Sequence, residues 1–137
     1  MKLDPSAFVA DPKLIQALGQ RAIELSCGAE SVLFHQGDKP AGVYILHKGE
    51  VTLTMTSLSG EAILSAQAAP GSVLGLPGLI GNEPYTLTAT ARSGAKLGFI
   101  ARDDFTAVMQ SDPSMSLKVL QVLAAEVRSA RHAILQR

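Results

Sequence analysis

GSVLGLPGLIGNEPYTLTAT, residues 71–90, is the stretch that decides the fold of this chain. Four glycines punctuate a short apolar run within it: Gly71, Gly75, Gly78 and Gly81. Pro84-Tyr85-Thr86 then opens an alternating segment that is typical of a β-strand. Glycine-rich segments let the backbone approach a phosphate closely, but the Gly-Lys-Ser/Thr end of a P-loop is absent here. The segment has the frame of a phosphate site without the charges of one.

Short strands are expected on both sides of this segment, separated by glycine turns. We expect them at residues 32–34, 43–46, 50–56, 61–68, 85–90 and 95–100. Residues 50–56 have the clearest period of two, with Val51, Leu53 and Met55 on one face and threonines on the other. Because no helices separate the strands, the pattern predicts an antiparallel double-stranded β-helix, or jelly roll. The fold class is therefore mainly β with flanking helices.

Helices are expected before and after the strands. Asp11-Pro12 is a typical helix start, with Asp as the N-cap and Pro in the first turn. Asp103 or Asp104 is expected to cap a short helix that ends at Met109. Asp112-Pro113 then starts a long helix that continues to residue 137. Residues 1–111 are thus expected to form the jelly roll with its N-terminal helix, and residues 112–137 a long C-terminal helix of the same domain.

The long helix carries an apolar stripe at heptad-like spacing: Leu120, Leu123, Val127, Ala130 and Ile134. A helix of this length must bury such a stripe against some surface. One surface is its own barrel, and the other is the same helix of a second copy. Because the stripe extends well past the barrel, we expect it to form the interface of a homodimer.

Composition limits the class of protein. A chain of 137 residues that is 47% hydrophobic suits one globular domain. Twelve acidic residues balance twelve basic ones, so no overall positive field indicates nucleic-acid binding. The single cysteine, Cys27, excludes an intrachain disulfide. No run is long enough for a membrane span and the first residues do not resemble a signal peptide, so we expect a cytoplasmic location.

The order of helix, jelly roll, short helix and long helix resembles the sensor half of the cyclic-AMP receptor/fumarate-nitrate regulator (Crp/Fnr) family. Phe34-His35-Gln36-Gly37-Asp38 is similar to the aromatic-x-x-Gly-Asp turn of that family, and Tyr44 to Val51 is similar to its tyrosine-strand-glycine-valine hairpin. Gly71 to Thr88 matches its cyclic-nucleotide-binding cassette. The resemblance implies a non-enzymatic sensor domain without the helix-turn-helix, so we expect no direct nucleic-acid binding by this chain.

The ligand-gripping residues depart from the family. There, a Gly-Glu pair holds the ribose and a Pro-Arg-Ser/Thr run holds the cyclic phosphate. Here Leu76 and Tyr85 stand at the glutamate and arginine positions, and no Lys or Arg occurs from Gly49 to Ala91. Losing the arginine pair alone is expected to cost about 3 kcal/mol, roughly a hundredfold in affinity. We therefore expect cyclic AMP and cyclic GMP to bind weakly or not at all.

The pocket implied by the resemblance is apolar, and a small apolar effector is a possible occupant. The alternative is that the pocket is filled by its own side chains. A second alternative is a true cyclic-nucleotide receptor in which Arg131, on the long helix, supplies the missing charge. The expected ligand-binding residues are Leu53, Leu64, Ser65, Gly75, Leu76, Pro77, Leu79, Tyr85, Thr86 and Arg131.

A jelly roll also raises the possibility of a cupin-like metalloenzyme. That chemistry needs two or three histidines and a carboxylate on adjacent strands. This chain has His35, His47 and His132, with no His-x-His pair. No Ser/His/Asp or Cys/His combination is supported by the pattern either. We therefore expect no catalytic residues, no metal and no cofactor.

Overall fold

The computed structural model describes residues 1–135, and Gln136 and Arg137 at the end of the expected long helix lie outside the described residues. Two four-stranded antiparallel sheets form the β-roll, with strand orders β1-β8-β3-β6 and β2-β7-β4-β5. The strands are β1 (Ile23–Ser26), β2 (Ser31–Phe34), β3 (Gly42–Lys48), β4 (Val51–Thr56), β5 (Ala62–Ala68), β6 (Val73–Leu74), β7 (Thr88–Ala91) and β8 (Lys96–Ala101). The predicted jelly roll is confirmed.

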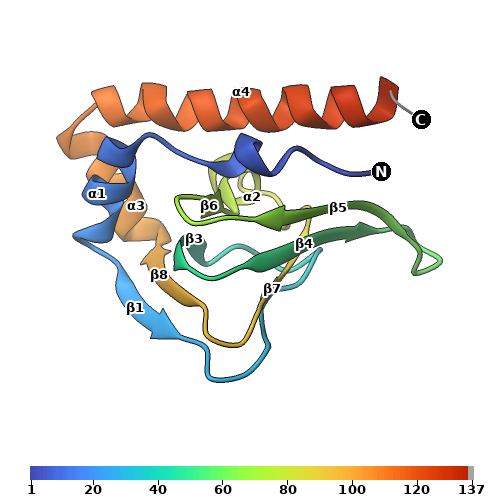
Figure 1. Ribbon diagram of the computed structural model, residues 1–137. Helices are drawn as coiled ribbons and strands as arrows, with labels where there is room; N and C mark the ends of the chain where they lie inside the picture. Colours follow the sequence, from blue (N-terminus) through green and yellow to red (C-terminus); the bar gives the residue numbers. More distant parts are fainter. Residues whose placement is uncertain (136–137) are drawn as a thin grey trace.

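Helices cover one side of the roll. They are the 3-10 turn η1 (Pro5–Phe8), α1 (Pro12–Gly19), α2 (Leu76–Gly81), α3 (Arg102–Ser111) and α4 (Ser114–Leu135). In Figure 1, α4 runs across the whole top of the molecule, and the N-terminal segment lies between it and the sheets. Among residues 1–135, no helix is both long and apolar enough to cross a lipid bilayer.

Asp11 caps α1 as the sequence predicted, and Asp112 lies just before the start of α4 at Ser114. The Asp11 carboxylate accepts from the Lys13 N–H at 2.7 Å, and that of Asp112 accepts from the Ser114 N–H at 3.1 Å. The capping prediction for α3 was wrong. This helix starts at Arg102 after an uncapped Ala101, so the two aspartates that follow lie inside its first turn. There they face the positive end of the helix dipole.

Two strand predictions also need correction. Strand β1 was missed although Ile-Glu-Leu-Ser alternates between apolar and polar residues, because the segment is only four residues long and is mostly exposed. The strand expected at 85–90 begins only at Thr88, because Tyr85 is held in a loop. The Tyr85 N–H donates to the Asp38 carbonyl at 2.9 Å, and the Tyr85 carbonyl accepts from the Gly37 N–H at 2.8 Å. These bonds tie the end of the glycine-rich segment to the turn after β2.

Helix α4 presents three faces. Its inner face packs on the roll and the other helices through Met115, Val119, Val122, Ser129 and Ala133. The Lys118 ammonium pairs with the Asp11 carboxylate at 2.9 Å, which fixes α1 to α4. The expected stripe is divided between the other two faces. Leu123 and Ala130 are half-buried, whereas Leu120, Val127 and Ile134 are 58%, 50% and 57% exposed. Packing onto its own barrel therefore covers only part of the helix.

Candidate functional site

The glycine-rich segment connects β6 to β7 through the short helix α2. Gly75 precedes α2 with φ +94°, a left-handed conformation that favours glycine. A Cβ at Gly75 would lie 2.9 Å from the Cε1 atom of the Tyr85 ring. Glycine is therefore needed at position 75 both for the backbone turn and for the approach of the tyrosine. Asn82, with φ 52°, ends the helix in the same left-handed region.

Tyr85 is part of the core. Its ring stacks on Phe34 with centroids 4.0 Å apart and an interplanar angle of 22°. Its hydroxyl donates to the Gly42 carbonyl at 2.7 Å. Burial raises the pKa of the Tyr85 phenol above its ordinary value, so the group stays neutral. The Tyr85 side chain thus fills the space between Gly75 and Phe34.

The guanidinium of Arg102 lies next to the same segment, and its donors already bind backbone carbonyls. Its guanidinium donates to the Leu79 carbonyl at 3.2 Å and to the Pro40 carbonyl at 3.1 Å. These bonds fasten the end of α2 to the loop before β3. The charge of Arg102 is therefore used to hold backbone carbonyls.

The space left in the cassette is a cavity of about 10 Å³, which we call the inner cavity. That volume accommodates roughly one water molecule. The lining residues are Phe8, Phe34, Leu53, Leu74, Gly75, Pro77, Gly78, Tyr85, Thr86, Leu87 and Glu126. The side chains of the cassette thus fill almost all of the space between them.

Glu126 is the residue of this site that the sequence analysis missed. It lies on α4 and its Oε2 atom is buried with no hydrogen-bond partner. Burial raises the pKa of its carboxyl from an ordinary 4.5 to about 8. The one signal in the sequence was an acidic residue inside an apolar run, VLAAEV. That signal alone does not tell which face of the helix meets the cassette.

A second space, which we call the α4 groove, continues outward from the inner cavity. It has a volume of about 220 Å³. Phe8, Pro77, Thr86, Leu87 and Glu126 border both spaces. The remaining lining residues of the groove are Leu3, Met55, Leu64, Leu123, Val127 and Ala130. Among the described residues that line either space there is no Lys, Arg or His.

The structure brings together only part of the expected site. Leu53, Gly75, Pro77, Tyr85 and Thr86 border the inner cavity, and Leu64 borders the α4 groove. The other expected residues lie outside both spaces: Ser65, Leu76, Leu79 and Arg131.

These four residues have other surroundings. Leu76 and Leu79 are buried among the residues that pack the helices onto the roll. The backbone of Ser65 pairs with the N-terminal segment, where its carbonyl accepts from the Leu3 N–H at 2.8 Å. Arg131 is exposed and borders a separate open hollow with Lys2 and Arg128. Leu76 is therefore a core residue.

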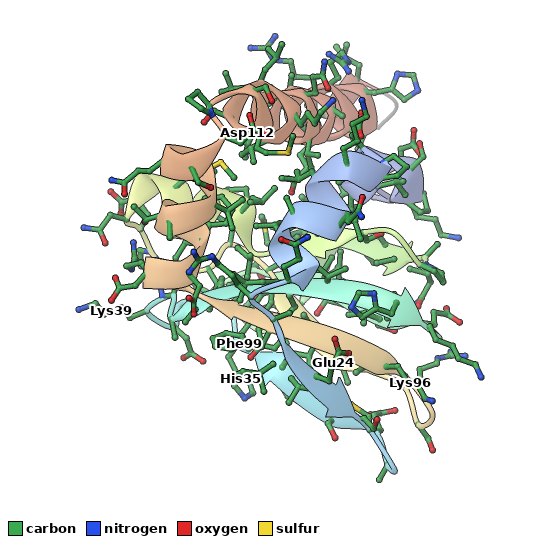
Figure 2. All side chains as sticks on the ribbon, turned by 90° about the vertical axis from the view of Figure 1, so that its left-hand side faces the viewer. Glu24, His35, Lys39, Lys96, Phe99 and Asp112 are labelled. Carbon is green, nitrogen blue, oxygen red and sulfur yellow. The ribbon has the colours of Figure 1, made fainter. Side chains whose placement is uncertain are left out.

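The histidines do not form a metal site. His35 lies near the bottom of the view in Figure 2, well away from α4, while His132 lies on α4 itself. Within residues 1–135, no group of three or more His, Cys, Asp or Glu side chains is placed to hold a metal ion.

Comparison with known proteins agrees with the fold. The family description "Cyclic nucleotide-binding domain" matches residues 24–112, well over half of the chain. The cyclic AMP receptor protein of Thermus thermophilus is 28% identical over 98 residues, which cover 72% of this chain and 45% of that protein. The lysophospholipase NTE1 of Chaetomium globosum is 26% identical over 125 residues, which cover 86% of this chain and 8% of that protein.

The chain spans less than half the length of these two curated relatives. Among solved structures, the Thermus thermophilus catabolite activator protein has the same fold, with a TM-score of 0.79 and 22% identity. That match covers 96% of this chain and 62% of the other. The β-roll, the glycine-rich cassette between β6 and β7, and the match over residues 24–112 together show that the chain belongs to the cyclic nucleotide-binding domain family.

Proposed function

We propose that this chain is a non-enzymatic regulatory domain whose cyclic-nucleotide site is closed. The observation that carries the proposal is the inner cavity of about 10 Å³, bounded by Tyr85 and by the Glu126 carboxyl. The 28% identical relative is named a cyclic AMP receptor protein, which supports a regulatory role for this chain. The function of the domain is then to transmit a signal other than cyclic AMP or cyclic GMP to a partner.

The charges of the site support this proposal. A cyclic phosphate carries a full negative charge and needs a cation or several donors. The cassette offers it the Thr86 hydroxyl and the Glu126 carboxyl, with no cation among the lining residues. When Glu126 is ionised it repels the phosphate, and when it is protonated it supplies one donor at most. Both states leave a buried anion largely unpaired, which is costly.

Titration calorimetry at pH 7 is expected to detect no binding of cyclic AMP or cyclic GMP below about millimolar concentration. The expected loss is at least the roughly hundredfold that follows from removing an arginine–phosphate pair. Low-micromolar binding of either nucleotide would overturn the closed-site proposal. If such binding were lost in Arg131→Ala while the fold was retained, Arg131 would be the source of the charge.

The outer face of α4 supports assembly with a second copy. Leu117, Leu120, Val127 and Ile134 are at least 50% exposed and follow one another at spacings of three and seven residues. This spacing is that of a coiled-coil seam. We propose that the domain forms a homodimer along this face. Leu123 and Ala130, which were expected in the seam, border the α4 groove instead.

The Leu120→Glu variant is expected to be monomeric under conditions where the wild type is dimeric. A charge at the centre of an apolar seam is left without solvent or a partner in the dimer. Leu58→Glu is the matched control, because Leu58 is fully exposed in the β4–β5 turn and far in sequence from α4. Sedimentation velocity measures both. A wild type that is monomeric at about 100 μM, or a Leu120→Glu variant that stays dimeric, would contradict the proposed interface.

A ligand in the α4 groove would act on this assembly directly. The groove is bordered by Leu123, Val127 and Ala130 of α4 and by Met55 and Leu64 of the roll. Val127 belongs to the outer face as well. An occupant that prefers one position of α4 over another shifts the population toward that position. We therefore propose that a small apolar effector in the groove regulates the domain.

A further inference from the structure

Glu126 gives the α4 groove one strongly directional group in apolar surroundings. Its Oε2 atom is buried and has no donor in the protein. The neighbouring side chains of the groove on α4 are Leu123, Val127 and Ala130, none of which can form a hydrogen bond. A carboxyl in such a place destabilises the fold unless something pairs with it. The residue therefore indicates a partner that is absent from the chain itself.

The chemistry of the lining selects among possible partners. An anionic ligand would meet a carboxyl and no cation. An alcohol or amide would give Oε2 one neutral hydrogen bond. A primary ammonium supplies up to three donors and the opposite charge, and charge-assisted bonds are about twice as strong as neutral ones. A water molecule fits the inner cavity and can satisfy the carboxyl until a ligand displaces it.

We propose that the α4 groove binds a small apolar amine, with its ammonium on the Glu126 carboxylate and its apolar body against the roll. This inference rests on the proposed function, since a nucleotide in the cassette would occupy the same side chains. The groove volume of about 220 Å³ is below the roughly 300–1,000 Å³ of sites for drug-sized ligands. The ligand is therefore of the size of one ring with a short chain.

Proton exchange gives this binding mode a signature. The neutral Glu126 carboxyl must lose its proton to pair with an ammonium, and that proton passes to the buffer. The carboxyl has a pKa of about 8, so at pH 7 the free protein is mostly protonated there. Binding of one ammonium at pH 7 then releases close to one proton. Among the residues that line either space, the other ionisable side chain is Tyr85, which borders the inner cavity, and its raised pKa keeps it neutral at this pH.

The test uses 2-phenylethylamine as the probe, with 2-phenylethanol and phenylacetate as neutral and anionic counterparts. Changes in backbone amide chemical shifts during an NMR titration give the affinity for the probe. They are expected to be largest at Met55, Leu64 and Leu123. Calorimetry in buffers of different ionisation enthalpy counts the protons released. We expect the amine to bind at about millimolar concentration and Glu126→Gln to weaken it at least tenfold. The same variant is expected to change the affinity for 2-phenylethanol by less than about threefold and to abolish proton release.

Two further variants act as controls. Glu83→Gln removes a carboxylate that is exposed in the loop after α2 and should change nothing. Ala130→Leu fills part of the groove and leaves the Glu126 carboxyl in place. It should weaken the binding of the amine and of the alcohol to the same extent. The inference is overturned if the amine does not bind, if Glu126→Gln binds it equally well, or if phenylacetate binds as tightly. Tight binding of cyclic AMP would overturn the proposed function itself, whereas failure of the amine alone leaves that function standing.

Discussion

At pH 8 the Glu126→Gln variant is expected to be about 3–4 kcal/mol more stable than the wild type, and near pH 4.5 the two should be nearly equal. The native carboxyl has a pKa of about 8 against an ordinary value of 4.5, because its surroundings exclude water. The folded state therefore binds a proton that the unfolded state releases. Wild-type stability should fall by about 1.4 kcal/mol per pH unit between these values from this group alone. The amide of the variant has no charge to bury. The free energy of unfolding of Glu126→Gln should therefore lack this dependence on pH.

Urea unfolding at half-unit steps from pH 4.5 to 8.5 measures this difference. Other ionisable groups contribute equally to both proteins and cancel when the two free energies of unfolding are subtracted. Glu83→Gln, at an exposed site, should run parallel to the wild type over the whole range. Parallel curves for Glu126→Gln and wild type would show that the Glu126 carboxyl is hydrated in the native state and is not buried without a partner.

The Tyr85→Ala variant is expected to lose about 3–5 kcal/mol of stability, in the range of other large-to-small aromatic truncations in cores. It removes the ring that stacks on Phe34 at 4.0 Å and the hydroxyl that donates to the Gly42 carbonyl. Tyr85→Phe separates the two contributions. It keeps the ring and leaves the Gly42 carbonyl without its donor, so it should cost about 1–3 kcal/mol.

Thermal and urea unfolding of the two variants at pH 5 measure these costs while Glu126 is protonated. A loss below about 1 kcal/mol in Tyr85→Ala would mean that the ring is not packed in the core. The cassette would then be open in solution, and a nucleotide-sized ligand could enter it. The same pair of variants therefore also tests whether the site is closed.

The sequence predicted the architecture because local patterns determine it. The alternation at 51–56 and the glycine turns gave β4 and its neighbours, and Asp11 and Asp112 marked two helix starts. The absence of Lys and Arg around Gly75 and Tyr85 was also readable, since it needs only the order of residues. The frame of the site could thus be predicted without coordinates.

The content of the site could not be predicted in the same way. Leu76 was expected in the pocket, but its direction depends on how α2 packs against β3 and α4, and it is buried in the core cluster there. Glu126 lies 41 residues after Tyr85 in the sequence, and only the packing of α4 onto the roll brings the two to one cavity. Periodicity describes each helix by itself. It does not give the rotation of α4 that places Glu126 inward and Leu120 outward.

The N-terminal segment has a consequence for any motion of α4. Residues before η1 run between α4 and β5 (Figure 1), and the Asp4 N–H donates to the Ser129 hydroxyl at 2.6 Å. Lys2 forms a parallel bridge to Ser65 of β5. Residues 1–4 therefore connect the C-terminal half of α4 to β5, the edge strand of its sheet. A displacement of α4 must strain or break the hydrogen bond between Asp4 and Ser129. Hydrogen exchange at the Asp4 amide would therefore report the position of the helix.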